Sequence, residues 1–466
     1  MPSPSGPAPS GPTPACPDGG RGADATARAD GARPAGYRAV FAVHEFRYVF
    51  AAHLLSSLGV VVCELALSVL VFRITASPLL GALTLALGLL PYAVGGTLLS
   101  AVADRCAARR VLVGCDLLCA LATAGMVLPG TPVPVLLALR CVLAVLAPVF
   151  AGTRAATLGE ILGAGEPFVL GRSVIRLVNQ GAQLAGFAAG GLLLAAVSPR
   201  SVLALTAGTF LASALLLRLG TRARPARGGV PGAAAGGALL GASLGGVRRL
   251  LADRRVRALL LLTWLPPAFV VVPEALLVPY SGLLGVGPAG TGLLLCAMPL
   301  GAVAAESLVG SLLGPRARAR LTFPMGVFAV LPSLGFAARP SFGWAVLLLV
   351  LTGTGISYNF GVDRWFVAAV PEELLGQAMT VMQAGRMSVM GLAMGLAGAA
   401  AEWAPLRVVM PAAGVVGVAA VAAVIREVRR TAQGAGGAGA GARPGGAPGG
   451  RTRPPGPKTE TRLTTM

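Results

Sequence analysis

Charged residues are scarce in this sequence: 12% of its 466 residues are Asp, Glu, Lys or Arg, whereas 55% are hydrophobic. A soluble globular chain carries about 25% charged residues, so this composition excludes one or two ordinary soluble domains. The mean hydropathy of +0.76 indicates that the lipid bilayer is the solvent. Because segments that cross lipid must satisfy their own backbone hydrogen bonds, we expect an all-α membrane protein.

Lysine and histidine are also nearly absent, and this limits the chemistry that the chain can perform. The one lysine, Lys458, lies in a Pro- and Gly-rich tail, so no glycine-rich loop ending in lysine can bind ATP phosphates. The seven cysteines are an odd number, and no histidine stands near them at a metal-ligand spacing. We therefore expect no enzyme activity, cofactor, metal or disulfide framework, and we expect energy from an ion gradient.

A low-complexity segment at residues 221–246 divides the chain into two apolar halves. After this segment, VRRLLADRRVRAL alternates arginine pairs with Leu and Val, which predicts a short amphipathic helix on the inner membrane surface. The predicted organisation is a disordered tail (1–45), a six-helix bundle (46–220), a cytoplasmic linker with the amphipathic helix (221–256), a second six-helix bundle (257–425) and a disordered tail (426–466).

Runs of apolar residues predict about twelve membrane spans, because a spanning helix needs about twenty apolar residues. The expected spans lie near residues 47–73, 79–102, 111–129, 132–152, 174–197, 200–219, 257–281, 288–314, 321–338, 342–365, 376–401 and 405–425.

The arginines give the orientation of these spans. The net charge of +20 comes from arginines that lie between apolar runs and form no single basic face, so we expect no nucleic-acid partner. Connections 2–3, 6–7 and 8–9 are rich in arginine, whereas connections 3–4 and 7–8 carry no charge. Since positive charge favours cytoplasmic connections, we expect a multi-pass protein of the inner (plasma) membrane with both termini in the cytoplasm.

Three residue pairs suggest an internal repeat. Glu64 and Glu274 are 210 residues apart, and each is followed fourteen residues later by a proline, Pro78 or Pro288. The same separation relates Arg154 to Arg364. These matches predict two six-helix pseudo-repeats, an arrangement that alternating-access transporters use.

The segment SAVADRCAARRVL, from Ser100 to Leu112, resembles the loop 2–3 signature of the major facilitator superfamily. LSSLGVVVCELALSVLVFRITASP, VPYSGLLGVGPAGTGLLL and FVAAVPEELLGQAM resemble macrolide-efflux and other drug-efflux members from actinobacteria, and the likeness covers about residues 46–425. Ser100, Ala107 and Ala108 depart from the signature. The resemblance implies the major facilitator fold and a loop that closes the inner gate, with gating residues Asp104, Arg105, Arg109 and Arg110.

Glycines in the fifth span give a second partial match. GAQLAGFAAGG is similar to the glycine-rich antiporter motif, with Phe187 in place of its proline. Gly186, Gly190 and Gly191 would in either case let two helices approach closely. The motif favours export over uptake.

Ionisable residues inside predicted spans are the candidates for proton and substrate binding. Glu64 has no arginine within a helical turn and is the first candidate for proton coupling, the alternative being a carboxylate that reaches water at the outer mouth. Arg140 resembles the arginine of the family's proton-transfer motif, and Glu64 on an adjacent helix is its expected partner. Glu274 is a substrate candidate in a span that we expect four prolines to interrupt.

Later spans hold further candidates. Asn359 and Asp363 share a helix face, and we expect Asp363 and Arg364 to form a gate or structural pair at the cytoplasmic end. Glu306 is a further coupling candidate, whereas Asp116 is expected to pair with loop arginines. Five methionines could line a pliable wall or simply fill the core: Met379, Met382, Met387, Met390 and Met394.

The predicted function is proton-coupled export of an amphiphilic small molecule, such as a drug or natural product, with antibiotic resistance as one outcome. Its partners are the small-molecule substrate, protons and the lipid bilayer, and we expect a monomer. The alternatives are a nutrient uptake symporter, a lipid flippase of the same fold, or a non-transporting membrane scaffold or sensor. The sequence does not identify the substrate, the coupling ion or the carboxyl group that titrates.

Overall fold

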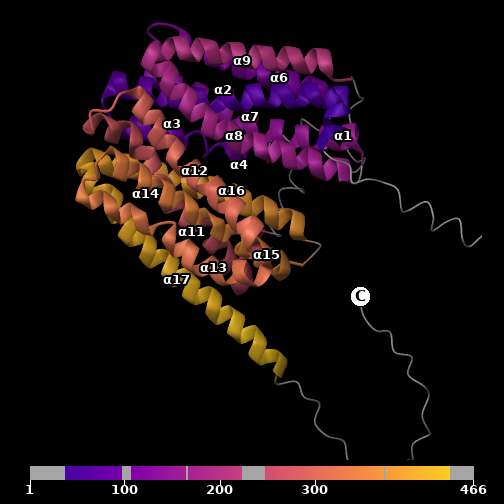
Figure 1. Cartoon of the computed structure of the whole chain (residues 1–466), viewed down its shortest axis with the longest axis vertical. Helices are drawn as coiled ribbons and strands as arrows, with labels where there is room; N and C mark the ends of the chain where they lie inside the picture. Colours follow the sequence, from indigo (N-terminus) through magenta and orange to yellow (C-terminus); the bar gives the residue numbers. More distant parts are fainter. Residues whose placement is uncertain (1–36, 97–105, 164–165, 223–246, 372–373, 441–466) are drawn as a thin grey trace, which may run out of the picture.

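The computed structural model describes residues 37–96, 106–163, 166–222, 247–371 and 374–440, and all of its regular elements are helices (Figure 1). The first half of the chain, the N-half, contains α1 (Tyr37–Ala42), α2 (His44–Thr75), α3 (Pro78–Ala86), α4 (Tyr92–Val94), α6 (Ala108–Val127), α7 (Val133–Leu162), α8 (Glu166–Ala196) and α9 (Pro199–Gly220). The C-half contains α11 (Arg254–Leu283), α12 (Pro288–Leu312), α13 (Pro315–Phe328), η2 (Leu331–Ala338), α14 (Phe342–Gly355), η3 (Ile356–Tyr358), α15 (Asn359–Ala369), α16 (Leu375–Trp403) and α17 (Leu406–Ala440).

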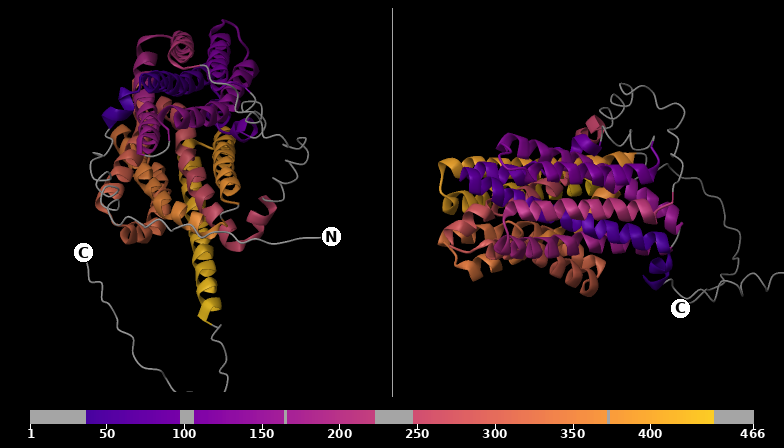
Figure 2. Two further views of the ribbon diagram at one scale, coloured as in Figure 1. Left: turned by 90° about the vertical axis from the view of Figure 1, so that its right-hand side faces the viewer. Right: turned by 90° about the horizontal axis from the view of Figure 1, so that it is seen from above.

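The number of membrane crossings agrees with the prediction of about twelve. Nine helical stretches within the described residues are long and apolar enough to cross a bilayer. The α3–α4 segment, α8 and α16 lie among these helices in the bundle and complete the set (Figure 1), and Figure 2 shows the bundle from two further sides. The ninth crossing changes from α13 into the 3₁₀ helix η2, and the tenth is α14, η3 and α15 in succession.

Several helices begin at a proline, because proline fixes the backbone angle of the first turn and lacks an N–H that would have no partner there. Pro78, Pro199, Pro288 and Pro315 each stand at a helix start. Ser77 and Ser198 cap α3 and α9 by accepting a backbone N–H bond on the side-chain oxygen.

Two sequence expectations about helix ends and breaks were wrong. The fourth span continues to Leu162 and the fifth begins at Glu166, so both extend beyond the apolar runs that the prediction measured. α11 is continuous from Arg254 to Leu283 although it contains four prolines: Pro266, Pro267, Pro273 and Pro279. A proline removes one hydrogen bond of the helix, and close packing on both sides of α11 supports the helix through these positions.

The repeat is present in the structure, but its spacing is not constant. Gly95 lies against the carbonyl group of Val145 in the N-half, and Gly301 lies in the same way against that of Val350 in the C-half. Gly95 and Gly301 are 206 residues apart, and Val145 and Val350 are 205 apart. The separation of 210 residues therefore holds near Pro78 and Pro288 and decreases along the following crossings.

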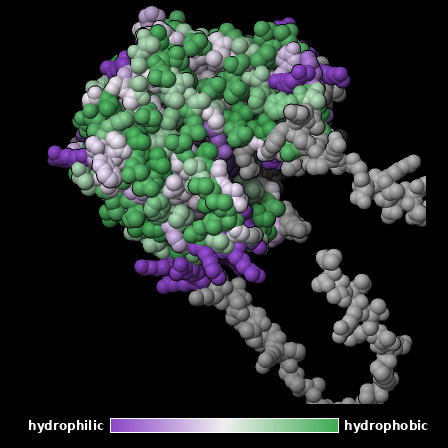
Figure 3. All heavy atoms as spheres, in the orientation of Figure 1, coloured by the Kyte–Doolittle hydropathy of each residue, from purple (hydrophilic) through white to green (hydrophobic). Residues whose placement is uncertain are grey.

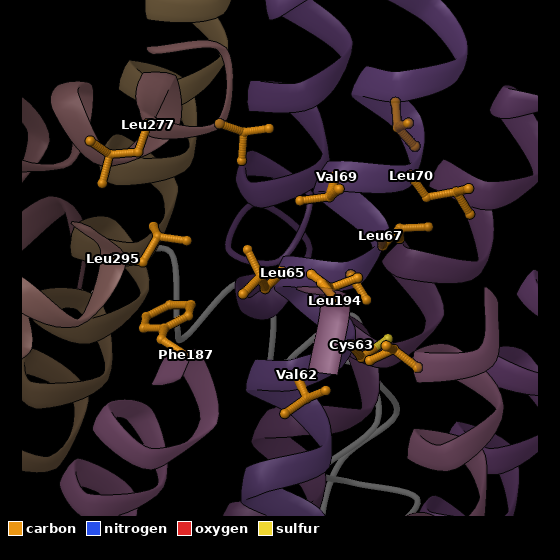
Figure 4. Packing of buried hydrophobic residues seen from close by; sticks show 14 of the residues in the cluster. Val62, Cys63, Leu65, Leu67, Val69, Leu70, Phe187, Leu194, Leu277 and Leu295 are labelled. Atoms are coloured by element: carbon orange, nitrogen blue, oxygen red, sulfur yellow. The ribbon is translucent and has the colours of Figure 1, made fainter. Parts of the chain in front are cut away.

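The bundle has two ends, which we name by residues. The Ser77 end carries the connections at residues 76–77, 128–132, 197–198, 284–287, 339–341 and 404–405, and the His44 end is the opposite one. One large hydrophobic cluster near the Ser77 end combines residues from α2, α8, α11 and α12, as Figure 4 shows for Leu65, Phe187, Leu277 and Leu295. Toward the His44 end, the clusters of the described residues belong to one half or the other.

Close helix contacts join the halves at the Ser77 end. Gly191 of α8 meets the backbone of α12 at Gly292, and a side-chain carbon on either glycine would collide with the other helix. Gly398 of α16 lies in the same way against Leu79 of α3. The antiporter-like glycines of the fifth span therefore make interhelical contacts, in agreement with the small-residue packing that their spacing favours.

The outer surface suits a bilayer. Large apolar side chains are strongly exposed around the bundle, among them Leu121 (70%), Leu219 (71%) and Leu312 (74%). Figure 3 shows that hydrophobic residues cover most of one face and that hydrophilic residues gather at its edges. In water such a surface would drive aggregation, whereas lipid tails cover it at no cost.

Candidate functional site

A central cavity of about 280 Å³ lies between the two halves. Side chains from both halves line it, including two carboxylates, and most of the remaining wall is apolar. The polar lining residues are Glu64 on α2, Gln183 on α8, Glu274 on α11, Tyr358 on η3, Asn359 on α15 and Arg386 on α16. Drug-sized ligands favour such a cavity, with apolar walls and a few polar groups that fix orientation.

Glu64 and Arg140 form an ion pair at one side of the cavity. Nη2 of Arg140 donates to Oε1 of Glu64 over 2.9 Å, and the arginine side chain is 4% exposed while that of the glutamate is 21% exposed. The ion pair between α2 and α7 that the sequence analysis predicts is therefore present in the structure. A charge-assisted hydrogen bond of this kind stabilises both ions inside the membrane.

Gly88 makes room for this ion pair. It lies directly against the guanidinium of Arg140, and a side-chain carbon at this position would overlap the arginine. The second crossing therefore needs a glycine here. Sequence reasoning missed Gly88, because one glycine among many in an apolar run gives no sign of what it faces.

Glu274 lines the same cavity in a different way. It has no hydrogen bond or ion pair with any residue in the described part of the chain. Glu64 lies close enough for its charge to act on Glu274. The two carboxylates of the repeat therefore come together in one cavity, with Glu64 paired to an arginine and Glu274 left to face the cavity.

The opposite wall combines polar groups with methionines. Nη2 of Arg386 donates to Oε1 of Gln383 over 2.7 Å, while its Nε and the hydroxyl of Tyr358 are buried without a partner among the described residues. Sequence analysis missed Tyr358, which lies beside the candidate Asn359. Of the five methionines, Met387, Met390 and Met394 line the central cavity. Met379 lines a separate cavity, and the carbonyl of Met382 accepts from Trp264 over 2.9 Å.

Glu306 and Asp116, also singled out in the sequence, lie elsewhere. Oε2 of Glu306 accepts from Gln180 over 2.8 Å, a bond between α12 and α8 that joins the halves outside the central cavity. The expectation that Asp116 pairs with loop arginines was wrong, because its carboxylate is buried and accepts from Ser56 and Ser213. Asp116 points into the bundle, and its position near the start of α6 did not reveal that direction.

Those gating candidates that the structure describes lie at the His44 end. Asp104 and Arg105 fall outside the described residues. Arg109 donates to the carbonyl of Arg218 at the end of α9, and Arg110 is exposed. Asp363 and Arg364 are exposed on α15, away from the central cavity.

Comparisons with solved structures give the same fold. The chain aligns with a crystal structure of the nucleoside transporter NupG at a TM-score of 0.65 and 15% identity, covering 82% of this chain and 99% of NupG. It aligns with a POT peptide transporter at a TM-score of 0.65 and 12% identity, covering 83% and 94%. At these identities the likeness shows the fold alone, and these neighbours do not favour the drug-efflux branch.

Sequence comparison identifies the family. No curated protein sequence matches the chain. The model of the Major Facilitator Superfamily matches residues 49–364, more than half of the chain. Together with the membrane-crossing bundle, this match shows that the chain is a multi-pass membrane protein and a secondary transporter that belongs to the Major Facilitator Superfamily.

Proposed function

We propose that this transporter is a proton-coupled exporter of amphiphilic small molecules. The observation that carries the proposal is the central cavity, in which Glu64 is paired with Arg140 while Glu274 faces the cavity without a partner among the described residues. A paired carboxylate that can release its arginine suits proton coupling, and an unpaired one suits substrate binding. The two roles thus go to different members of one repeat.

The coupling step follows from the charge of Glu64. When Glu64 takes up a proton it becomes neutral, and its attraction to Arg140 decreases to that of an ordinary hydrogen bond. Arg140 can then bond to a different partner. If Arg140 has different partners in the two conformations of the transporter, Glu64 binds the proton with a different affinity in each of them. A ligand shifts a conformational equilibrium only through such a difference in affinity.

Substrate binding follows from the walls of the cavity. Glu274 provides an acceptor for a hydrogen-bond donor or a cationic group, and Met387, Met390 and Met394 provide a soft apolar surface. These features fit an amphiphilic compound with one polar end better than a fully polar nutrient. A thioether wall adapts to ligands of different shape, which suits a transporter with several substrates.

The arginine clusters support an orientation with both termini in the cytoplasm. The Ser77 end, where the halves share a core, would then face outward, and this conformation would admit substrate from the cytoplasm. A reporter fused after Arg110 or Arg320 should report cytoplasm, and one at Gly130 or Gly285 should report the outside. The reverse pattern at two of these sites would contradict the orientation.

Transport by the reconstituted full chain tests the coupling role. In proteoliposomes with an imposed pH gradient, Glu64→Gln should abolish gradient-driven transport while binding of the same substrate in detergent persists, because glutamine keeps the shape but cannot titrate. Glu274→Gln should weaken binding and leave residual coupling.

Glu306→Gln is the matched control, because Glu306 is an intramembrane carboxylate that bonds to Gln180 outside the central cavity. Full activity of Glu64→Gln would exclude Glu64 as the coupling site. Accumulation of substrate in the direction of proton entry would favour the rival proposal, an uptake symporter.

A further inference from the structure

A second cavity of about 360 Å³ lies inside the N-half, and the proposed coupling cycle does not use it. We call it the N-half chamber. Its apolar walls come from α2, α7 and α9, among them Val60, Leu146 and Phe210. Gln183 lines both this chamber and the central cavity. The other polar lining residues are His53, Ser56, Ser57, Tyr92, Asp116, Arg154 and Asn179.

Arg154 brings a buried positive charge to the chamber. The residue is 9% exposed, its guanidinium lies 5.3 Å from the ring centre of Phe150, and Nη1 donates to Nδ1 of His53. In the part of the chain that the structure describes, it has no ion-pair partner. A membrane-buried arginine without a carboxylate is costly, and an anion in the chamber would offset that cost.

His53 adds a second donor. Its Nδ1 accepts from Arg154 and lies 3.1 Å from the hydroxyl oxygen of Ser57, so the ring is neutral and carries its proton on Nε2. The residue is 3% exposed, and Nε2 makes no well-aligned hydrogen bond among the described residues, although the side chain of Asn179 and the backbone of Ile175 lie near the ring. A buried N–H without an acceptor is destabilising, and the carboxylate of a ligand could provide that acceptor.

Asp116 lies close enough for its charge to act on Arg154, but its carboxylate oxygens accept from hydroxyl groups and form no ion pair with the guanidinium. Oδ1 accepts from Ser56 over 3.0 Å and Oδ2 accepts from Ser213 over 2.5 Å. These bonds tie α6 to α2 and α9. Asp116 therefore holds the helices of the chamber together, and among the described residues it makes no direct hydrogen bond with Arg154 or His53.

The part of the C-half that the structure describes has no equivalent group. Its ninth crossing, α13 with η2, contains no acidic residue, and its tenth crossing carries Asp363 and Arg364 exposed on α15. Among the described residues of the C-half, no arginine or histidine is buried. The buried Arg154 and His53 are therefore a feature of the N-half alone.

We propose that the N-half chamber is a binding site for an organic anion. A carboxylate of the ligand would accept from the guanidinium of Arg154 and from Nε2–H of His53, and its apolar body would lie against Val60, Leu146 and Phe210. The chamber is large enough for an arylalkyl acid. The site is separate from the proton site at Glu64 and does not depend on the direction of transport.

Calorimetric binding of 4-phenylbutyrate to the purified full chain in neutral detergent tests this site. The acid should bind at least about tenfold more tightly than 4-phenylbutylamine, which has the same apolar body and the opposite charge. Arg154→Gln should remove this preference. Arg73→Gln, the same change at an exposed arginine of the N-half, should leave it unchanged.

A second variant covers the case in which Arg154→Gln fails to fold. Ala147 lines the chamber and is exposed, so Ala147→Trp should fill the cavity without removing a charge, and it should also abolish binding of the acid. Acid binding that survives in Ala147→Trp, or tighter binding of the amine in the unmodified chain, would overturn the proposal. Neither measurement needs a gradient, so this site can fail or hold independently of the proposed proton coupling.

Discussion

The N-half and the C-half follow one plan of six crossings, yet they treat charge inside the membrane differently. The N-half buries Arg140 against Glu64 and keeps Asp116 and Arg154 in a chamber of its own. The C-half directs its acidic Glu274 to the shared cavity and fills its interior with apolar side chains. This difference is what we expect if the buried charges of the N-half serve the proton and anion binding proposed above.

Removal of one partner of the ion pair is the strongest test of this contrast. Arg140→Ala should lower the free energy of unfolding by about 3 kcal/mol, because Glu64 would keep its charge without a partner. Arg386→Ala in the C-half should cost about 1 kcal/mol, since its described partner Gln383 is neutral. Thermal unfolding in neutral detergent measures both changes. Equal losses would mean that the two halves do not differ in this respect.

A larger residue at Gly88 should act on the same pair from the neighbouring helix. Gly88→Val should lower stability by about 2 kcal/mol, because the new side chain overlaps the guanidinium of Arg140. Gly208→Val is the control, since nothing lies within 4 Å of a side-chain carbon at that position. A Gly88→Val protein as stable as its control would show that Arg140 can move aside without loss.

A smaller effect is expected where the halves meet at the Ser77 end. The carboxylate of Glu402 accepts from the hydroxyl of Ser77 and from the backbone N–H of Leu79, the latter over 3.1 Å. Glu402→Ala should shift the balance away from this closed end by at most about fivefold, because the contact is exposed to solvent. The distance between spin labels at the exposed positions 74 and 403 reports the closed population without replacing a glycine. An unchanged distance distribution would assign the closure to the glycine contacts alone.

The smallest effect is expected at Arg364. This residue is exposed on α15, whereas Arg154, which stands 210 residues earlier in the sequence, is buried. Arg364→Gln should therefore change the free energy of unfolding by less than about 0.5 kcal/mol. A loss near that of Arg140→Ala, in the same unfolding assay, would show that exposure does not decide the contribution of an arginine in this bundle.

The sequence predicted the fold well because lipid imposes a simple rule on it. Apolar runs of the necessary length, with arginines between them, determine the number of crossings almost without reference to tertiary contacts. Helix ends were predicted less well, since α7 and α8 continue as helices past the apolar residues. The partner of Arg140 was predictable because few acidic residues lie within the spans.

The N-half chamber could not be predicted in the same way. His53, Asp116 and Arg154 lie on three helices and meet only through packing, so their spacing in the sequence carries no sign of the contact. Gly88 posed a related difficulty, because its role is the space that it leaves for a side chain of another helix. Residues that act by direct charge were found, and residues that act by position or by small size were missed.

The glycine contact between α8 and α12 has a kinetic consequence. Where Gly191 meets Gly292, the two helices touch through their backbones. No side chain has to change its rotamer there when the helices separate or come together again. Separation of the helices at this point therefore increases the side-chain entropy only slightly, and closure decreases it only slightly. We expect the charged and hydrogen-bonded contacts elsewhere in the bundle to determine the rate of exchange between conformations. A bulky residue at either glycine should therefore change the populations of the two conformations far more than the rate of exchange between them.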